Sequence, residues 1–190
     1  FPDTSHWTVV KPKDSGYFQD VSLKALGNFA KDKNIKIEIS QIKGTFILKE
    51  LPLLRFDGAT LSEEELSKLQ EFFHFSKNEL VEENYVLAFK QLTEIAVKAM
   101  SPGINDPGTA INAIDYLTDL FALRMKKKDN SFLFDADDHA YVSIKTVAFN
   151  ELVYNVMAAL RTYCIHDIIV LQKLFMMLSY LLEHVQPIDS

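Results

Sequence analysis

The spacing of apolar residues changes near residue 60, and this change constrains the fold more than any other feature of the sequence. Before residue 60, Ile35, Ile37 and Ile39 alternate with polar residues. Such alternation predicts a β-strand with one buried face. After residue 60, apolar residues recur at every third or fourth position, which predicts amphipathic helices. We therefore predict an α+β fold, in which a small strand-rich N-terminal subdomain packs on a mainly α-helical bundle.

Residues 1–60 are predicted to form the small mixed α/β subdomain. A short helix is expected to begin near Asp20 or Ser22, either of which can cap it. Its apolar face comprises Leu23, Leu26, Phe29 and Ala30. Further short strands are expected at residues 7–10, 46–48 and 53–56, and Gly16 is interpreted as a turn glycine. These strands could close into a small barrel.

Residues 61–190 are predicted to form the helical bundle, with four or five helices. Ser62 and Glu65 have the spacing of a capping box, and the helix that they begin is expected to include Phe73. Longer helices are expected at residues 84–100, 107–125, 146–163 and 167–184. In the last of these helices the expected apolar face comprises Leu171, Leu174, Phe175, Leu178 and Leu182.

Charge and cysteine content exclude several classes of protein. The 190 residues include 20 Lys and Arg against 26 Asp and Glu, a formal net charge of −6, so we predict no nucleic-acid binding. Cys164 is the single cysteine, which excludes an intrachain disulfide and fits a reducing compartment. It lies in an apolar helical pattern and is predicted to be an inert core thiol. Polar residues interrupt the apolar stretch at 164–182, so no membrane-spanning segment is predicted.

Nucleotide-binding, hydrolase and zinc-protease motifs are absent from the sequence. Asp135, Asp137, Asp138 and His139 could together hold a divalent cation, but the spacing lacks the downstream glycine and glutamate of an EF-hand. A solvated acidic loop explains the cluster equally well, so we predict no metal site, and the sequence identifies no cofactor. Asp167 is expected to cap the last helix.

The segment from Ser101 to Pro107 predicts a stiff corner between two helices. Pro102 disfavours helical geometry at Ser101 and therefore ends the preceding helix. Gly103 is expected to adopt positive φ near that end. Pro107 fits the first position of the next helix, with Asp106 as its N-cap.

This corner is the candidate ligand-binding site. Ser101, Asn105 and Asp106 offer oxygen acceptors to a cation or a hydrogen-bond donor. Thr109 and Asp115, on the following helix, complete the candidate set. A carboxylate at this corner could act as a base if burial raised its pKa, although the N–H groups that a cap accepts have the opposite effect. In the alternative interpretation, all of these groups serve only the turn itself.

The corner also carries a family resemblance. Residues 95–110, IAVKAMSPGINDPGTA, with the following Ile114-Asp115-Tyr116-Leu117, closely resemble the signature of DUF2254, a family of domains of unknown function. The segments SGYFQD at 15–20, GTFI at 44–47, Pro52-Leu53 and 149–163 are similar to further family motifs. Glu50, Glu79 and Glu83-Asn84 depart from the family pattern, which has glycine, arginine and a Gln-Asp pair there.

The resemblance implies a location and an architecture but no activity. Members of the family are predicted bacterial membrane proteins with N-terminal transmembrane helices and then a soluble region, which this chain resembles. Because the chain begins with Phe1 instead of Met, we expect it to be a piece of a longer protein. It is expected to lie on the cytoplasmic side of the cell membrane, to be held there by transmembrane helices outside this chain, and to form homo-oligomers.

We expect this module to sense a ligand, to assemble the protein or to gate a pore, with a small molecule or a cation as a possible ligand. Two alternatives stay open. One is an enzyme that uses the polar groups at Ser101–Asp106. The other is a scaffold for a protein partner, for which a large exposed apolar patch would be the expected sign.

Overall fold

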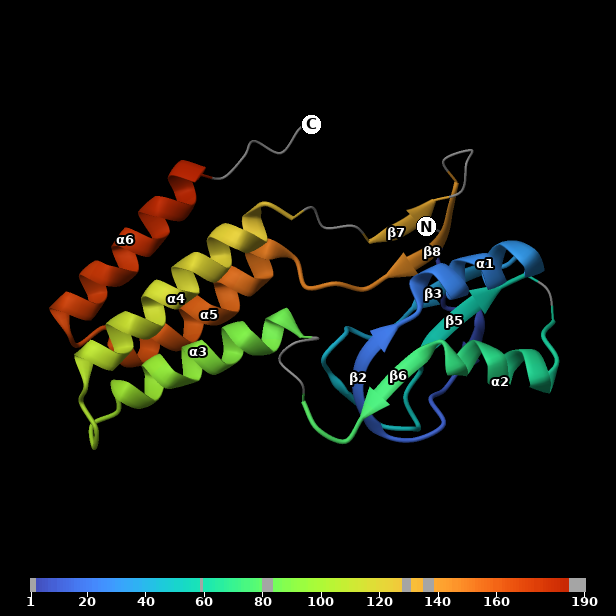
Figure 1. Cartoon of the computed structure of the whole chain (residues 1–190), viewed down its shortest axis with the longest axis horizontal. Coiled ribbons are helices and arrows are strands. Elements are labelled where there is room, and N and C mark those ends of the chain that lie inside the picture. Colours follow the sequence, from blue (N-terminus) through green and yellow to red (C-terminus); the bar gives the residue numbers. More distant parts are fainter. Residues whose placement is uncertain (1–2, 59, 80–83, 128–130, 135–138, 185–190) are drawn as a thin grey trace. The chain divides into compact units, whose positions relative to one another are not determined.

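The computed structural model describes residues 3–58, 60–79, 84–127, 131–134 and 139–184. The chain forms two compact units, shown in Figure 1 and treated separately here. The strand-rich unit comprises Phe1–Asn84 and Asn130–Thr146, and the helical unit comprises Tyr85–Asp129 and Val147–Ser190. The chain therefore passes between the units three times.

The strand-rich unit contains two sheets and two helices (Figure 1). Its elements are β1 (Thr8–Val10), β2 (Gly16–Val21), α1 (Leu23–Lys33), β3 (Lys36–Ile39), β4 (Phe46–Ile47), β5 (Leu54–Asp57), α2 (Glu63–Glu71), β6 (Phe73–Ser76), β7 (Phe132–Phe134) and β8 (Ala140–Ile144). The five-stranded sheet has the order β1-β5-β3-β8-β7, and the three-stranded sheet has the order β4-β2-β6. All paired strands are antiparallel except β3 and β8.

The alternating isoleucines are buried as predicted. Ile37 and Ile39 lie on β3, between β5 and β8, and pack in one apolar cluster with Leu26 and Phe29 of α1. Ser62 and Glu65 form the predicted capping box at the start of α2. The described strands form two sheets and not a single small barrel. Gly16 is not a turn residue: it lies in β2, where an added Cβ would be 3.0 Å from the Ser76 carbonyl oxygen of the neighbouring strand.

The strand-rich unit includes chain segments well beyond residue 60. Phe73, which we expected in a helix, begins β6, because α2 ends at Glu71 and residues 73–76 pair with β2. The hairpin of β7 and β8 comes from between two helices of the helical unit, and its β8 pairs with β3. Sequence spacing missed these strands because each is only three to five residues long.

The helical unit consists of α3 (Tyr85–Ala99), α4 (Pro107–Met125), α5 (Phe149–Cys164) and α6 (Ile168–His184). In this unit α4 packs against α3 and α6, and α3 packs against α5 (Figure 1). The Phe121 ring is buried between Phe89 and Phe149, with ring centroids 4.6 and 5.9 Å away. In the described part of the chain, no helix combines the length and the hydrophobicity that crossing a bilayer requires.

The apolar face of α6 differs from the expected one. The structure buries Val170, Leu174, Met177 and Leu181. Phe175 and Leu182, which were expected in the core, are 60% and 77% exposed. Apolar residues surround this helix on all sides, so their spacing could not identify which face the unit buries. The start of α6 is as predicted: Asp167 Oδ1 accepts hydrogen bonds from the N–H groups of Ile169 and Val170, each at 2.9 Å.

Candidate functional site

The corner between α3 and α4 is tied to the end of α3 by backbone hydrogen bonds. The Asp106 N–H donates to the Ala99 carbonyl oxygen at 2.8 Å, and the N–H groups of Ile104 and Asn105 donate to the Ser101 carbonyl oxygen at 3.0 Å. The Ser101 hydroxyl donates to the Lys98 carbonyl oxygen at 2.7 Å. Ser101 therefore satisfies an acceptor at the C-terminus of α3.

Asp106 caps α4, as predicted. Its Oδ2 accepts a hydrogen bond from the Thr109 hydroxyl at 2.6 Å, and its Oδ1 accepts one from the Thr109 N–H at 3.1 Å. These two bonds from Thr109, the hydroxyl first, hold the pKa of Asp106 below its ordinary value. The carboxylate is thus ionised at neutral pH and already occupied, which is unfavourable for a general base.

The positive φ of the corner belongs to Asn105 and not to Gly103. Asn105 has φ of 47°, a left-handed conformation that asparagine tolerates better than most residues. A Cβ added at Gly103 would have no heavy atom within 4 Å, so the turn does not require glycine there. Ile104, between them, is exposed. Gly103 and the Ile104 side chain are therefore the features of this corner that its own fold leaves unexplained.

Asp115 does not join the corner. It lies nine residues after Asp106 along α4, which corresponds to about 13 Å of helix. Its carboxylate forms an ion pair with Lys173 of α6. The structure therefore brings Ser101, Asn105, Asp106 and Thr109 together and assigns Asp115 to helix packing.

A second group of motif residues meets in the strand-rich unit, where we had predicted no site. Strand β2 pairs with β4, and the Gly44 N–H donates to the Phe18 carbonyl oxygen at 2.7 Å. The buried Asn84 side chain donates to the Gly44 carbonyl oxygen at 3.3 Å. Gly44 has φ of +89°, and a Cβ there would be 2.0 Å from Asn84 Nδ2. We call this packed contact the Gly44–Asn84 junction.

Gln19 follows Phe18 in β2, and its side chain carries a buried hydrogen-bond acceptor, Oε1. Its side chain is 6% exposed, and its Nε2 donates to the Asn78 carbonyl oxygen at 3.0 Å. Among the residues that the structure describes, its Oε1 has no hydrogen-bond partner. Leaving a buried acceptor unpaired costs about 1–3 kcal/mol, so this oxygen is a place for an ordered water or another donor. The sequence signal for this buried acceptor was a polar residue, Gln19, within the SGYFQD segment, most of which forms β2.

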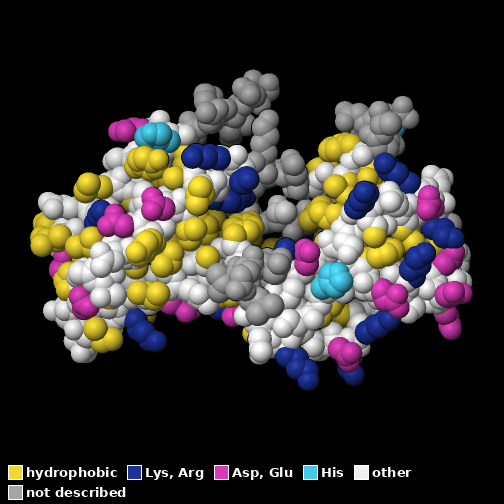
Figure 2. Space-filling view, viewed as in Figure 1, with side chains coloured by type: hydrophobic (Ala, Val, Ile, Leu, Met, Phe, Trp, Pro, Cys, Tyr) yellow, Lys and Arg dark blue, Asp and Glu magenta, His cyan; other side chains and the backbone are white. Residues whose placement is uncertain are grey.

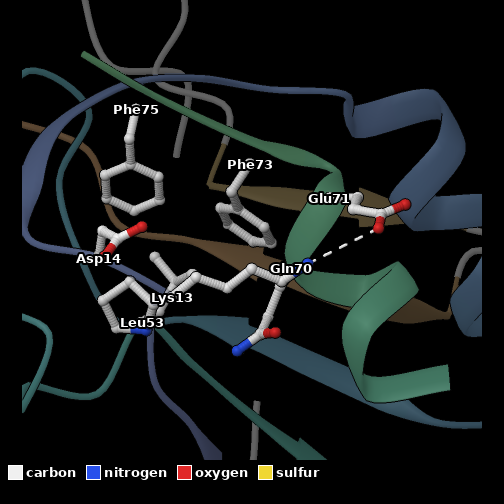
Figure 3. A pocket seen from close by; sticks show the side chains of 8 residues that line it. Lys13, Asp14, Leu53, Gln70, Glu71, Phe73 and Phe75 are labelled. Carbon is white, nitrogen blue, oxygen red and sulfur yellow. Dashed lines mark ion pairs between the residues drawn. The ribbon is translucent and has the colours of Figure 1, made fainter. Parts of the chain in front are cut away.

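A pocket of about 260 Å³ opens beside α2 and β6 (Figure 3). Leu53, Phe73 and Phe75 give it apolar walls. Lys13 lies at its edge and forms an ion pair with Glu71 at 3.6 Å. The Lys13 ammonium also donates to Ser67 Oγ at 3.0 Å. This arrangement can hold a small amphipathic molecule, but it presents no activated nucleophile.

A groove of about 240 Å³ lies between α3 and α5 in the helical unit. Phe89, Leu152 and Val156 supply most of its apolar lining, and Lys90 and Glu94 add charged groups. Neither this groove nor the pocket beside α2 is lined by residues of the corner. The two cavities therefore offer binding space away from the site that the sequence predicted.

Metal and thiol chemistry find little support in the described residues. Across these residues, no group of three or more His, Cys, Asp or Glu is placed to hold a metal ion. Of the acidic run considered from sequence, Asp135, Asp137 and Asp138 lie outside the described residues. Cys164 is buried, and burial raises the pKa of its thiol, with a further contribution from Asp167. This is the environment of a structural cysteine.

The fold defines an α+β protein of two units. At its polar corner, Ser101 and Asp106 form hydrogen bonds at the ends of the two helices that the corner joins. The chain belongs to the family described as "Predicted membrane protein (DUF2254)", whose model matches residues 1–180. No curated protein and no solved structure matches the chain.

Proposed function

We propose that this chain is an assembly module of an integral membrane protein. The observation that carries the proposal is the surface of the helical unit. Among the described residues of this unit, ten large apolar or aromatic side chains are more than half exposed: Ile104, Tyr116, Leu123, Tyr154, Ile165, Ile168, Ile169, Phe175, Met176 and Leu182. Figure 2 shows hydrophobic side chains gathered on the visible face of this unit. Where exposed apolar side chains form a contiguous patch, the patch is typical of a site that contacts a partner.

The proposed location is the cytoplasmic side of the membrane. The family description supports the membrane. The lone buried thiol supports a reducing compartment, since extracellular domains of modest size commonly carry disulfides. A cysteine introduced as Gly103→Cys, at an exposed position without positive φ, would test the side in a Cys164→Ala background. We expect a membrane-impermeant maleimide to label it in lysed cells and not in intact cells; labelling in intact cells would contradict the proposal.

The assembly role is tested on the full-length protein in its membrane. Chemical cross-linking in native membranes, followed by native mass spectrometry after detergent extraction, reports the number of subunits. We expect a complex with more than one copy of the protein. A protein that stays a single subunit in both measurements would overturn the assembly role.

Ligand sensing is a second candidate function, favoured by the groove between α3 and α5. Its apolar lining with Lys90 and Glu94 beside it suits a small amphipathic molecule. Native mass spectrometry of the purified chain would reveal a retained ligand as a discrete added mass. We expect Val156→Trp, which fills the groove, to remove that mass. An enzyme at Ser101–Asp106 has less support, because the carboxylate is engaged as a helix cap.

A further inference from the structure

We infer that the pocket beside α2 and β6 binds a small organic ammonium ion, whose charge is recognised by Asp14 and whose carbon skeleton lies against aromatic side chains. This inference goes beyond the proposed assembly function and does not depend on it. The pocket has a volume of about 260 Å³, and every residue that lines it belongs to the strand-rich unit. The lining comprises Pro12, Lys13, Asp14, Leu53, Gln70, Glu71, Phe73 and Phe75.

The charged side chains of this lining are engaged to different extents. Lys13 is its only basic residue, and the Lys13 ammonium pairs with Glu71 at 3.6 Å and donates to Ser67 Oγ at 3.0 Å. The exposed Asp14 carboxylate forms no hydrogen bond or ion pair with another residue that the structure describes. The positive charge of the pocket is therefore neutralised by Glu71, and the negative charge of Asp14 stays open to a ligand.

Gln70 adds a second open acceptor to the pocket. Its Nε2 donates to the Lys11 carbonyl oxygen at 2.7 Å, whereas its Oε1 accepts no hydrogen bond from the described part of the chain. Gln70 and Glu71 are the last residues of α2, where the helix dipole is negative. These groups together favour a ligand that is positively charged and donates hydrogen bonds. An anionic ligand would instead have to displace Glu71 from Lys13.

The aromatic walls favour an organic cation over a metal ion. Phe73 and Phe75 are two residues apart on β6 and therefore project to the same side of the strand. Figure 3 shows both rings along the pocket. The face of an aromatic ring attracts an ammonium group, and Leu53 extends the apolar surface for a carbon skeleton. Mg²⁺ and Ca²⁺ bind through about six or more oxygen ligands, which a lining with this much apolar surface does not offer.

Titration of the purified chain with three small probes, followed by ligand-observed NMR, tests the inference. Phenethylammonium, phenethyl alcohol and hydrocinnamate share one aromatic skeleton and differ in a positive, neutral or negative head group. We expect phenethylammonium to bind about tenfold more tightly than either of the others, the effect of a hydrogen bond to a charged group. A chain that does not bind phenethylammonium at millimolar concentration, or that binds hydrocinnamate equally well, would overturn the inference.

Asp14→Asn tests which carboxylate recognises the charge. We expect this variant to bind phenethylammonium about tenfold more weakly and phenethyl alcohol as the wild type does. Asp32→Asn is the matched control, because it removes the same charge from an exposed residue of α1 outside the pocket lining. It should leave the binding of all three probes unchanged. An equal loss in both variants would show that net charge, and not this pocket, attracts the ammonium ion.

Phe75→Leu tests the aromatic wall while it keeps an apolar side chain. We expect this variant to weaken phenethylammonium binding about threefold more than phenethyl alcohol binding, because the ring no longer attracts the cation. A melting temperature near that of the wild type confirms that each variant is folded. If both probes are weakened equally, the ring does not recognise the charge, and its part in the inference is wrong. None of these results changes the subunit number, by which the assembly function is tested.

Discussion

Asp106 carries both a negative charge and the hydrogen bonds that begin α4, and substitution can separate the two. Asparagine caps helices about as well as aspartate, whereas alanine has no side-chain acceptor. We expect Asp106→Asn to keep the melting temperature near that of the wild type. We expect Asp106→Ala to lower it by about 2–4 °C, as loss of one cap does in a protein of this size. Circular dichroism at 222 nm during heating measures both.

The same pair of variants distinguishes a structural from a chemical role for this residue. A purely structural Asp106 predicts that subunit number and retained ligand mass are unchanged in Asp106→Asn. If either changes while the melting temperature does not, the charge itself has a role and the interpretation of Asp106 as a cap alone is wrong.

Gly44 is the residue for which the structure gives the strongest steric argument. It has positive φ, which is unfavourable for alanine, and the Asn84 amide lies where the Cβ of an alanine would be. We expect Gly44→Ala to destabilise the strand-rich unit by about 2 kcal/mol or more. Urea denaturation followed by fluorescence of the single tryptophan, Trp7, measures this change. Gly103→Ala is the control and should have little effect, because the added methyl group meets no neighbouring atom.

At the scale of elements, the contacts at the start of α2 should make the free energy of unfolding depend on pH in the acidic range. Glu65 accepts hydrogen bonds from the Lys33 ammonium and the Ser62 N–H, which lower its pKa from 4.5 to about 2. Because this pKa is depressed in the folded state, its contribution is present above pH 4.5 and is lost as the pH falls toward 2. We expect Glu65→Gln to flatten the fall in stability over that window.

The measurement is the urea midpoint of the Trp7 transition at several pH values from neutral to acidic. Glu64→Gln is the matched control, because Glu64 lies in the same first turn of α2 but is not the capping-box residue. A pH dependence that Glu64→Gln and Glu65→Gln change equally would show that general charge, and not this contact, causes it.

The long helices and the caps of α2, α4 and α6 were predictable from sequence because their signals are local, whereas Ser22, a candidate cap for α1, makes no side-chain cap hydrogen bond. Ser62 and Glu65 begin α2, Asp106 and Pro107 begin α4, and Asp167 begins α6, as expected. The central strand β3 was predictable because its alternation is unbroken. Each of these patterns spans only a few turns or residues, so no tertiary contact was needed to interpret it.

Other elements depend on contacts between distant segments. Strand β8 is specified by pairing with β3, about a hundred residues earlier, and β6 is specified by pairing with β2. The buried face of α6 is determined by packing against α4, since apolar residues occur on every side of this helix. Likewise, the candidate site could be predicted as a helix corner, but the ion pair of Asp115 with Lys173 and the Gly44–Asn84 junction required the packed structure.

At the scale of the whole molecule, the chain carries one natural reporter in each unit. Trp7 is the single tryptophan and is buried in the strand-rich unit. Cys164 is the single cysteine and is buried in the helical unit. Trp7 fluorescence therefore follows unfolding of the first unit, and the rate of thiol labelling follows opening of the second.

These reporters test whether β8 stabilises the strand-rich unit, to which it belongs, and not the helical unit, whose segments precede and follow it in the sequence. Val142 of β8 lies between α4 and α5 in sequence, but its side chain is buried in the core of the strand-rich unit. We expect Val142→Ala to destabilise the Trp7 transition by about 2 kcal/mol and to leave Cys164 labelling unchanged. Leu117→Ala, which removes a buried side chain of α4, should have the reverse effect. We expect it to lower the free energy of unfolding of the helical unit by about 2–5 kcal/mol. Cys164 labelling should therefore become faster, and the Trp7 transition should not change. If each variant moved both reporters together, the two units would unfold as one cooperative structure, and the separation of their cores would not extend to their stability.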